Sequence, residues 1–210
     1  MRICLVSLSD IPDDLPSLSF GESENKRLAA IRNPHRRKES LCALLALREL
    51  LGNPLPRIQR DPNGKPFFAD SSLPPFSLCH GGEWAAAMLG DEASGAVGID
   101  LEVIRPYPYA HRIAKRFFSS REYAEFLEAD GSEQSFFHLW TQKEALSKLH
   151  GNGILSEEQA VADFCASYRL SLPNKTLMLS VCSEHCGKAL SWQSPSECFT
   201  QIQIEEIFKK

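Results

Sequence analysis

Hydrophobic and polar positions divide the chain into strand-like and helix-like segments. In the first half, the apolar run 3–8 predicts a buried strand, and the leucine-rich stretch 36–51, which stops at Gly52, predicts a helix. The pattern also predicts a helix over 22–32, a turn at 61–64, and strands over 66–69, 75–79, 84–90 and 96–103. This half therefore resembles helices packed on a small antiparallel sheet.

The second half has the same character in a different order. Helical patterns cover 109–117, 120–129 and 133–149, and Ser119 to Glu122 has the spacing of a capping box. Alternating segments then predict strands near 165–172, 176–182, 188–193 and 198–204. We predict an α+β fold with two small lobes, residues 1–105 and 106–210.

Composition narrows the class of protein only modestly. The 210 residues are 43% hydrophobic and 24% charged, and the net charge of −4 gives no global argument for binding nucleic acid or a membrane. The chain contains no apolar run of 18 residues that could span a bilayer. Its seven cysteines are odd in number and irregularly spaced, so we expect reduced, mostly buried thiols and a cytoplasmic protein.

The first candidate site lies in the strand Val97-Gly98-Ile99-Asp100-Leu101-Glu102. Side chains at i and i+2 of a strand point the same way, so Asp100 and Glu102 share one face. Gly98 lies on that face too, and we expect it to leave space above the strand. The opposite face is apolar. A solvated strand face is the alternative interpretation.

The helical segment 133–149 offers matching chemistry. Trp140, Glu144 and Lys148 are spaced i, i+4, i+8 and fall on roughly one stripe. Three converging carboxylates need a cation, for which Mg²⁺ is the usual choice, and a lysine beside it suits a phosphate-bearing substrate. The alternatives are a surface ion pair between Glu144 and Lys148, and a purely packing role for Trp140.

Three further segments carry weaker signals. Lys65 leaves a tight turn, where a lysine is well placed to meet a phosphate, and His80 ends a strand just before Gly81-Gly82. Arg36 and Arg37 precede a helix, where cations are mildly disfavoured unless an anion binds nearby. A structural histidine and a solvated helix start are the alternatives.

Together these segments resemble the 4′-phosphopantetheinyl transferases of the two-lobed, surfactin-type class. That family carries a (V/I)-G-(I/V)-D-x-E strand, which matches residues 97–102, and W-x-x-K-E-A-x-x-K, which matches WTQKEALSK from Trp140 to Lys148. It also carries G-K-P, found here at 64–66, and a Ser-His pair, in whose place this chain has Cys79-His80. The resemblance runs from about residue 24 to residue 155.

The resemblance implies a fold and a reaction. The two similar lobes would be related by a pseudo-twofold axis with the active site between them, in a monomer. The enzyme would transfer the phosphopantetheine arm of coenzyme A to a serine of an apo carrier protein and release adenosine 3′,5′-bisphosphate. Fatty-acid, polyketide, peptide-synthetase and lysine-biosynthesis carriers all remain open.

The resemblance also implies residue roles. Asp100, Glu102 and Glu144 would hold Mg²⁺, or Mn²⁺, with Glu144 also the candidate general base. Lys148 would stabilise charge developing toward the leaving phosphate. The coenzyme A contacts would come from Arg36, Arg37, Lys65, Cys79, His80 and Lys148. A thiol is a poorer hydrogen-bond partner than a hydroxyl, so Cys79 should alter affinity more than chemistry.

A basic stretch between the two main motifs is the candidate docking face for the carrier protein. Its residues are Arg112, Lys115, Arg116, Phe117 and Arg121. Carrier proteins of this kind are acidic, so complementary charge around an apolar contact would favour docking here. The alternative is that Phe117 and Phe118 belong to the core and that only the charges face outward.

Two competing functions stay open on the sequence. A Mg²⁺-dependent phosphohydrolase or nuclease would use the same acidic triad and lysine, but it predicts phosphate release without a carrier and a wider basic surface. A non-catalytic module that binds carrier proteins or coenzyme A would be expected to have lost a metal carboxylate or the lysine. This chain keeps all four side chains.

Overall fold

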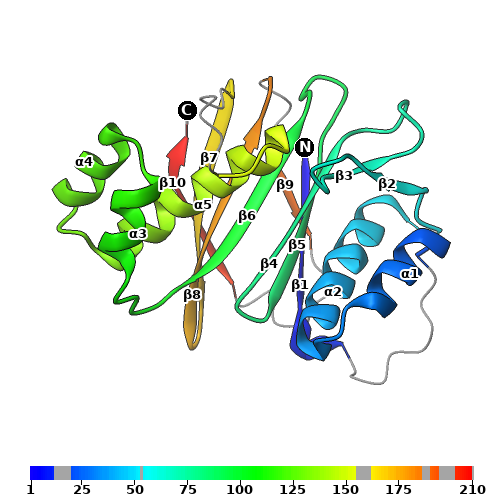
Figure 1. The fold of residues 1–210 in the computed structure, drawn as a ribbon, viewed down its shortest axis with the longest axis horizontal. Helices are drawn as coiled ribbons and strands as arrows, with labels where there is room; N and C mark the ends of the chain where they lie inside the picture. The colour runs from blue at the N-terminus through cyan, green and yellow to red at the C-terminus, as the bar shows by residue number, and fades with distance from the viewer. Residues whose placement is uncertain (12–19, 53, 155–161, 186–189, 194–201, 210) are drawn as a thin grey trace.

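The computed structural model describes residues 1–11, 20–52, 54–154, 162–185, 190–193 and 202–209 (Figure 1). The elements of the first half are β1 (Arg2–Ser7), η1 (Leu8–Asp10), α1 (Glu22–Ala30), α2 (Pro34–Leu51), β2 (Ile58–Arg60), β3 (Pro66–Phe68), β4 (Phe76–Gly81), β5 (Trp84–Leu89) and β6 (Val97–Ile104). Those of the second half are α3 (Ala110–Phe117), α4 (Ser120–Glu128), α5 (Glu133–His150), β7 (Phe164–Leu172), β8 (Lys175–Ser183), β9 (Ser191–Gln193) and β10 (Gln203–Lys209). The predicted α+β class is confirmed.

The first sheet has the strand order β4-β5-β1-β9 and is covered by α2. Asn33 begins this helix by accepting a hydrogen bond from the Arg36 N–H at 3.1 Å, and Pro34 occupies its first turn. Gly52 ends it at φ 92°, a conformation that favours glycine. Because the leucine-rich face of α2 is buried against β1 and β5, burial of apolar surface fixes the helix on the sheet.

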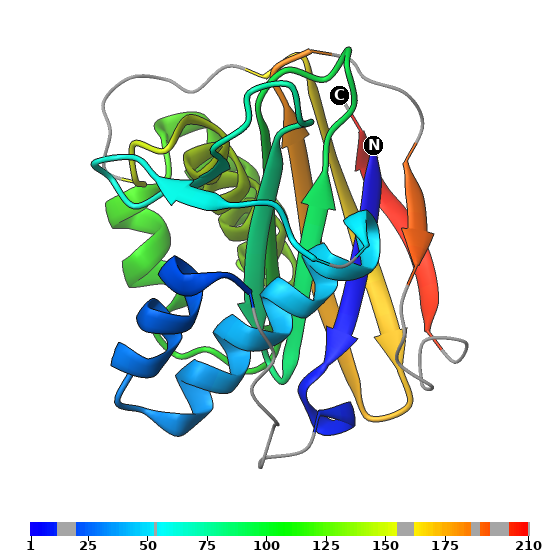
Figure 2. The same ribbon diagram turned by 90° about the vertical axis from the view of Figure 1, so that its right-hand side faces the viewer.

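The second sheet has the order β10-β7-β8-β6, all antiparallel, and packs against α5. The predicted capping box of α4 is confirmed, with Ser119 accepting from the Glu122 N–H and Glu122 accepting from the Ser119 N–H. Figure 1 shows α1 and α2 at one end of the molecule and α3 and α4 at the other, with α5 running from that second end toward the middle across the second sheet. Figure 2 gives the side view of the sheets with their helices.

The two sheets share an apolar cluster on the faces turned away from α2 and α5. It includes Ile3 and Leu5 of β1 and Ile99 and Leu101 of β6. The sheet edges also meet, because the Ile99 N–H donates to the Ser77 hydroxyl of β4 at 3.2 Å. Strands β4 and β6 thus bring the two sheets together at the position of the first sequence motif.

The strands do not follow the predicted lobes strictly. Strand β6, which precedes residue 105, pairs with β8 in the second sheet, whereas the late strand β9 pairs in parallel with β1 in the first. The division into residues 1–105 and 106–210 and the pseudo-twofold axis both stay predictions. Strand β2 was not predicted, and the part of the predicted strand 198–204 before residue 202 lies outside the described residues.

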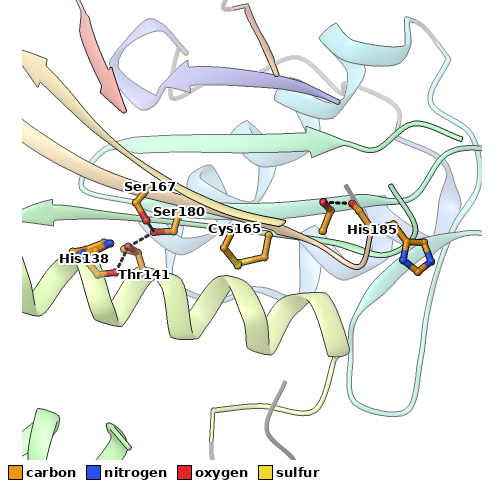
Figure 3. The surroundings of a disulfide bond; sticks show 8 residues. His138, Thr141, Cys165, Ser167, Ser180 and His185 are labelled. Carbon is orange, nitrogen blue, oxygen red and sulfur yellow. Dashed lines mark hydrogen bonds between the residues drawn. A yellow bond between two sulfur atoms is a disulfide. The ribbon is translucent and has the colours of Figure 1, made fainter. Parts of the chain in front are cut away.

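One cysteine pair differs from expectation. Cys165 and Cys182 form a disulfide beneath α5, so the prediction of reduced thiols is wrong for these two (Figure 3). The antiparallel pairing of β7 with β8 places them directly opposite one another, a long-range register that cysteine spacing does not reveal. Cys4, Cys42 and Cys79 are free and buried, as predicted.

The described part of the chain has no helix long and apolar enough to cross a membrane.

Candidate active site

The site begins with a close approach between β6 and α5. A Cβ atom built on Gly98 would lie 2.0 Å from the Ala145 carbonyl oxygen and 2.7 Å from the Leu149 nitrogen. The prediction that Gly98 leaves open space is therefore wrong, because the helix backbone fills that space. Glycine allows α5 to pack directly on the strand, and this brings the two sequence motifs together.

Lys148 and Asp100 form the central contact of the site. The Lys148 Nζ donates to Asp100 Oδ1 at 2.6 Å, and the Asp100 side chain is only 7% exposed. Burial opposes the charge on Lys148, but the charge and hydrogen bond of Asp100, together with other neighbours that include Glu144, outweigh it and raise the lysine pKa. The second oxygen, Asp100 Oδ2, is buried and has no hydrogen-bond partner among the described residues.

Glu102 and Glu144 complete the acidic group. Burial, reinforced by the Asp100 charge, raises the pKa of Glu102 to about 7, although Arg105 and Lys148 partly oppose the shift. Burial and Asp100 also raise the pKa of Glu144. Each carboxylate therefore lies in a region where negative charge is crowded and poorly solvated. The strand and helix positions predicted for all three are those observed.

These carboxylates are not already gathered as metal ligands. Within the described ranges, no three His, Cys, Asp or Glu side chains form a group that could hold a metal ion. Lys148 instead occupies one oxygen of Asp100. The predicted set of metal ligands stays a prediction, although the unpartnered Oδ2 atom and the raised pKa values of both glutamates fit a cation in this position.

A cleft of about 280 Å³ opens beside Lys148, between the β2–β3 turn and the end of α5. Lys65, Ser77 and Ser147 contribute polar groups to its lining, together with Lys148. The Lys65 Nζ donates to the Leu149 carbonyl oxygen at 2.5 Å, at the C-terminal end of α5, and burial lowers the pKa of this lysine. Two lysines from distant motifs thus line one cleft, as expected for a phosphate-bearing ligand.

His80 and Cys79 lie on opposite faces of β4. His80 is solvent-exposed, and its Nδ1 lies 3.5 Å from Glu39 Oε2 of α2. Cys79 faces the apolar cluster between the sheets and is 3% exposed, and burial raises its pKa to about 12. This position gives no support to a direct contact between the thiol and a ligand in the cleft.

The two predicted arginines at the start of α2 are exposed. Arg37 donates from Nε and Nη2 to the Ile31 carbonyl oxygen at 3.0 and 2.7 Å, so its guanidinium is already engaged in ending α1. Arg36 contributes its backbone N–H to the Asn33 cap. Their predicted contact with coenzyme A is untested.

The predicted docking face lies on α3 and the start of α4. Arg112, Lys115, Arg116 and Arg121 are all exposed. Phe117 is half-buried against Trp140, with ring centroids 5.9 Å apart, and the Arg116 guanidinium lies over Phe117 at 5.1 Å. Trp140 therefore has the packing role given as an alternative, while Phe118 belongs to the core, 8% exposed.

Sequence reasoning missed some contributors to this region. Ser77 and Ser147 have no distinctive spacing, and their place in the cleft follows from the meeting of β4 and α5. Glu39 carried a weak local signal, since it lies four residues after His35 on a helix, but its contact with His80 is long-range.

Comparison with known proteins agrees with this geometry. The model of the 4′-phosphopantetheinyl transferase superfamily matches residues 96–187. The 4′-phosphopantetheinyl transferase AcpT of Salmonella typhimurium is 34% identical over 173 residues, which cover 80% of this chain and 87% of that protein. The transferase Sfp of Bacillus subtilis is 32% identical over 157 residues, which cover 64% of this chain and 67% of Sfp.

A third relative matches over a shorter region. The transferase psf-1 of Bacillus pumilus is 40% identical over 112 residues, 51% of this chain, and the match spans less than half, 46%, of psf-1. With the two motifs joined by the contact between Asp100 and Lys148, and with AcpT similar along most of its length, the chain belongs to the 4′-phosphopantetheinyl transferase superfamily.

Proposed function

We propose that this protein transfers the 4′-phosphopantetheine arm of coenzyme A to a serine of an apo carrier protein. The observation that carries the proposal is the meeting of Asp100, Glu144 and Lys148 beside the cleft that Lys65 also lines. Two cationic side chains at a cleft suit the phosphates of coenzyme A, and adjacent carboxylates suit a metal-assisted phosphoryl transfer. Family membership supports the same reaction.

The donor set fits Mg²⁺ or Mn²⁺, with Asp100, Glu102 and Glu144 as the ligands. Carboxylate oxygens are the ligands that these hard cations take, and Asp100 Oδ2 is buried without a hydrogen-bond partner among the described atoms. Like-charge crowding at both glutamates would be relieved by a dication. When bound, the ion supplies charge neutralisation at the pyrophosphate.

The protein residues then have separate tasks. The serine hydroxyl of the carrier gives its proton to Glu144, directly or through water, as its oxygen attacks the phosphorus on the pantetheine side of the pyrophosphate. The bond from that phosphorus to the bridging oxygen breaks, and its electron pair leaves with adenosine 3′,5′-bisphosphate. The raised pKa of Lys148 keeps the lysine charged beside the leaving phosphate.

The carrier would approach over α3. Exposed Arg112, Lys115, Arg116 and Arg121 form a basic face, and half-buried Phe117 offers an apolar contact among them. An acidic carrier would be steered to this face by complementary charge. We propose that a single chain suffices for transfer, because β6 and α5 of one chain supply all of the acidic residues.

Intact-mass spectrometry of apo carriers tests the proposal. Carriers of several classes are incubated with coenzyme A, Mg²⁺ and the protein, with and without EDTA, and the matched variants are Glu144→Gln and Glu128→Gln. Glu128 is exposed on α4, so its change controls for loss of one charge. We expect metal-dependent gain of one phosphopantetheine with the wild type and Glu128→Gln, and little gain with Glu144→Gln.

The competing functions give different outcomes. Release of inorganic phosphate without any carrier would favour a phosphohydrolase. Binding of coenzyme A without mass gain on any carrier would favour a non-catalytic module, and either result would overturn the proposal.

A further inference from the structure

Glu39 lies between two imidazole rings at the edge of the candidate site. Its Oε2 atom is 3.5 Å from His80 Nδ1, and its Oε1 atom is 3.5 Å from His35 Nε2. The Glu39 side chain is 14% exposed, whereas His80 is 43% exposed. A mostly buried carboxylate therefore contacts an accessible imidazole, with one oxygen directed to each histidine.

The fold explains this contact. Helix α2 begins at Pro34, so Glu39 falls in its second turn, and α2 packs across the sheet that contains β4. His80 lies two residues after Leu78 on β4, and alternate residues of a strand share a face. Because Leu78 packs against the cluster that contains the leucines of α2, His80 lies on the α2 side of the strand. The contact therefore links α2 to β4, the strand whose residues Phe76, Ser77 and Leu78 line the cleft.

The charges that face His80 come from three elements. Glu39 and His35 belong to α2, Lys148 to α5 and Asp100 to β6. Burial lowers the pKa of His80, Lys148 and His35 lower it further, and Glu39 is the strongest of the groups that oppose this shift. Without Glu39, the remaining surroundings would disfavour the imidazolium form.

We propose that Glu39 is a positioning residue that holds the His80 ring by Nδ1, so that Nε2 donates to an anionic phosphate group of coenzyme A. This inference rests on the proposed function. A carboxylate on one ring nitrogen fixes the tautomer and the orientation of the other nitrogen, and it favours the cationic ring that an anion needs. Glu39 itself does not touch the substrate in this arrangement.

Steady-state kinetics with coenzyme A as the varied substrate tests the role. We expect Glu39→Gln to raise KM for coenzyme A about three- to tenfold with kcat changed less than twofold, because only ligand binding loses its oriented partner. Glu49→Gln is the matched control, since Glu49 is exposed on the same helix and the change removes the same charge. It should leave KM and kcat at wild-type values.

A double variant separates positioning from general loss of structure. If Glu39 acts through His80, then Glu39→Gln should add little to the KM of His80→Gln. Fully multiplicative effects would overturn the inference, as would an unchanged KM in Glu39→Gln or a loss confined to kcat.

Nuclear magnetic resonance of the free protein tests the contact without reference to catalysis. We expect the His80 imidazole to titrate at lower pH in Glu39→Gln than in the wild type, with no change in Glu49→Gln. If the wild type modifies no carrier, the proposed function fails, and the titration still decides whether Glu39 controls His80. An unchanged His80 titration in Glu39→Gln would overturn the positioning role itself.

Discussion

The ammonium group of Lys148 lies 2.6 Å from Oδ1 of Asp100, and this contact joins the two sequence motifs. Asp100 sits on β6 and Lys148 one turn beyond Glu144 on α5, so the pair is both a structural link and part of the candidate site. Because Asp100 takes part in this link and Glu144 does not, we expect substitutions of the two carboxylates to affect stability differently.

Asp100→Asn should reduce both stability and transfer, whereas Glu144→Gln should reduce transfer alone. Removing the Asp100 charge leaves a largely desolvated ammonium without its anion. We expect a loss of about 1–3 kcal/mol, below that of a fully enclosed pair, because the Lys148 side chain is 31% exposed. Thermal denaturation and the mass assay measure the two effects. Equal stability of both variants would contradict a structural role for the pair.

Gly98→Ala should separate α5 from β6. The new methyl group would overlap the Ala145 carbonyl oxygen, which belongs to helix backbone and cannot rotate away. We expect a loss of about 1–3 kcal/mol in unfolding free energy and a fall in transfer of at least about tenfold, because Glu144 and Lys148 would shift from the strand carboxylates. Differential scanning calorimetry and initial rates check this. If Gly98→Ala keeps the wild-type unfolding free energy and the wild-type rate, then the close packing of α5 on β6 is not needed for stability or for transfer.

Mg²⁺ should stabilise the wild type and have little effect on Glu102→Gln. A cation that binds the folded state raises the melting temperature by mass action, and the crowded carboxylates are the site that we propose for it. Without metal, Glu102→Gln should melt above the wild type, since the change removes one of the mutually repelling charges. Melting curves with Mg²⁺ or EDTA test both statements. If Mg²⁺ does not change the melting temperature of the wild type, the result would argue against a metal between these side chains.

Arg116→Glu should weaken carrier binding and leave coenzyme A binding intact. Arg116 lies on the exposed face of α3, away from the residues that line the cleft. We expect an increase of about five- to fiftyfold in KM for an acidic carrier, larger at low salt. Lys26→Glu on α1 produces the same change in net charge and serves as the control. Equal damage to the KM values of both substrates would refute the docking face.

Reducing the Cys165–Cys182 disulfide should lower the melting temperature. The two cysteines are 17 residues apart, and a loop of this size stabilises by about 3 kcal/mol, which corresponds to roughly 6–12 °C in a chain of this length. A Cys165→Ala, Cys182→Ala double variant should no longer respond to dithiothreitol. Melting curves with and without reductant, together with thiol titration, provide the measurement. If reductant leaves the wild-type melting temperature unchanged, the bond does not hold β7 to β8 in solution.

Local features of the fold were predictable from the sequence. Helices predicted over 109–117 and 133–149 are observed as α3 (Ala110–Phe117) and α5 (Glu133–His150), because amphipathic periodicity and end signals are encoded within each segment. The shared face of Asp100 and Glu102 followed from strand alternation in the same way.

Relationships between distant segments were not predictable. Nothing local indicates that β6 pairs with β8, that Cys165 faces Cys182, or that Gly98 meets the backbone of α5. The Glu39–His80 contact likewise depends on how α2 crosses the first sheet. Such contacts arise from packing of whole elements, so they appear only once the sheets are assembled.

The parallel pairing of β9 with β1 has a consequence for synthesis on the ribosome. Strand β1 is made well before Ser191–Gln193, so its outer edge lacks this partner until those residues have been synthesised. An unpaired strand edge is a template for association with other chains. Until then the nascent chain exposes an edge that can pair with another chain, and we expect chains stopped before residue 191 to aggregate while chains that include Ser191–Gln193 do not.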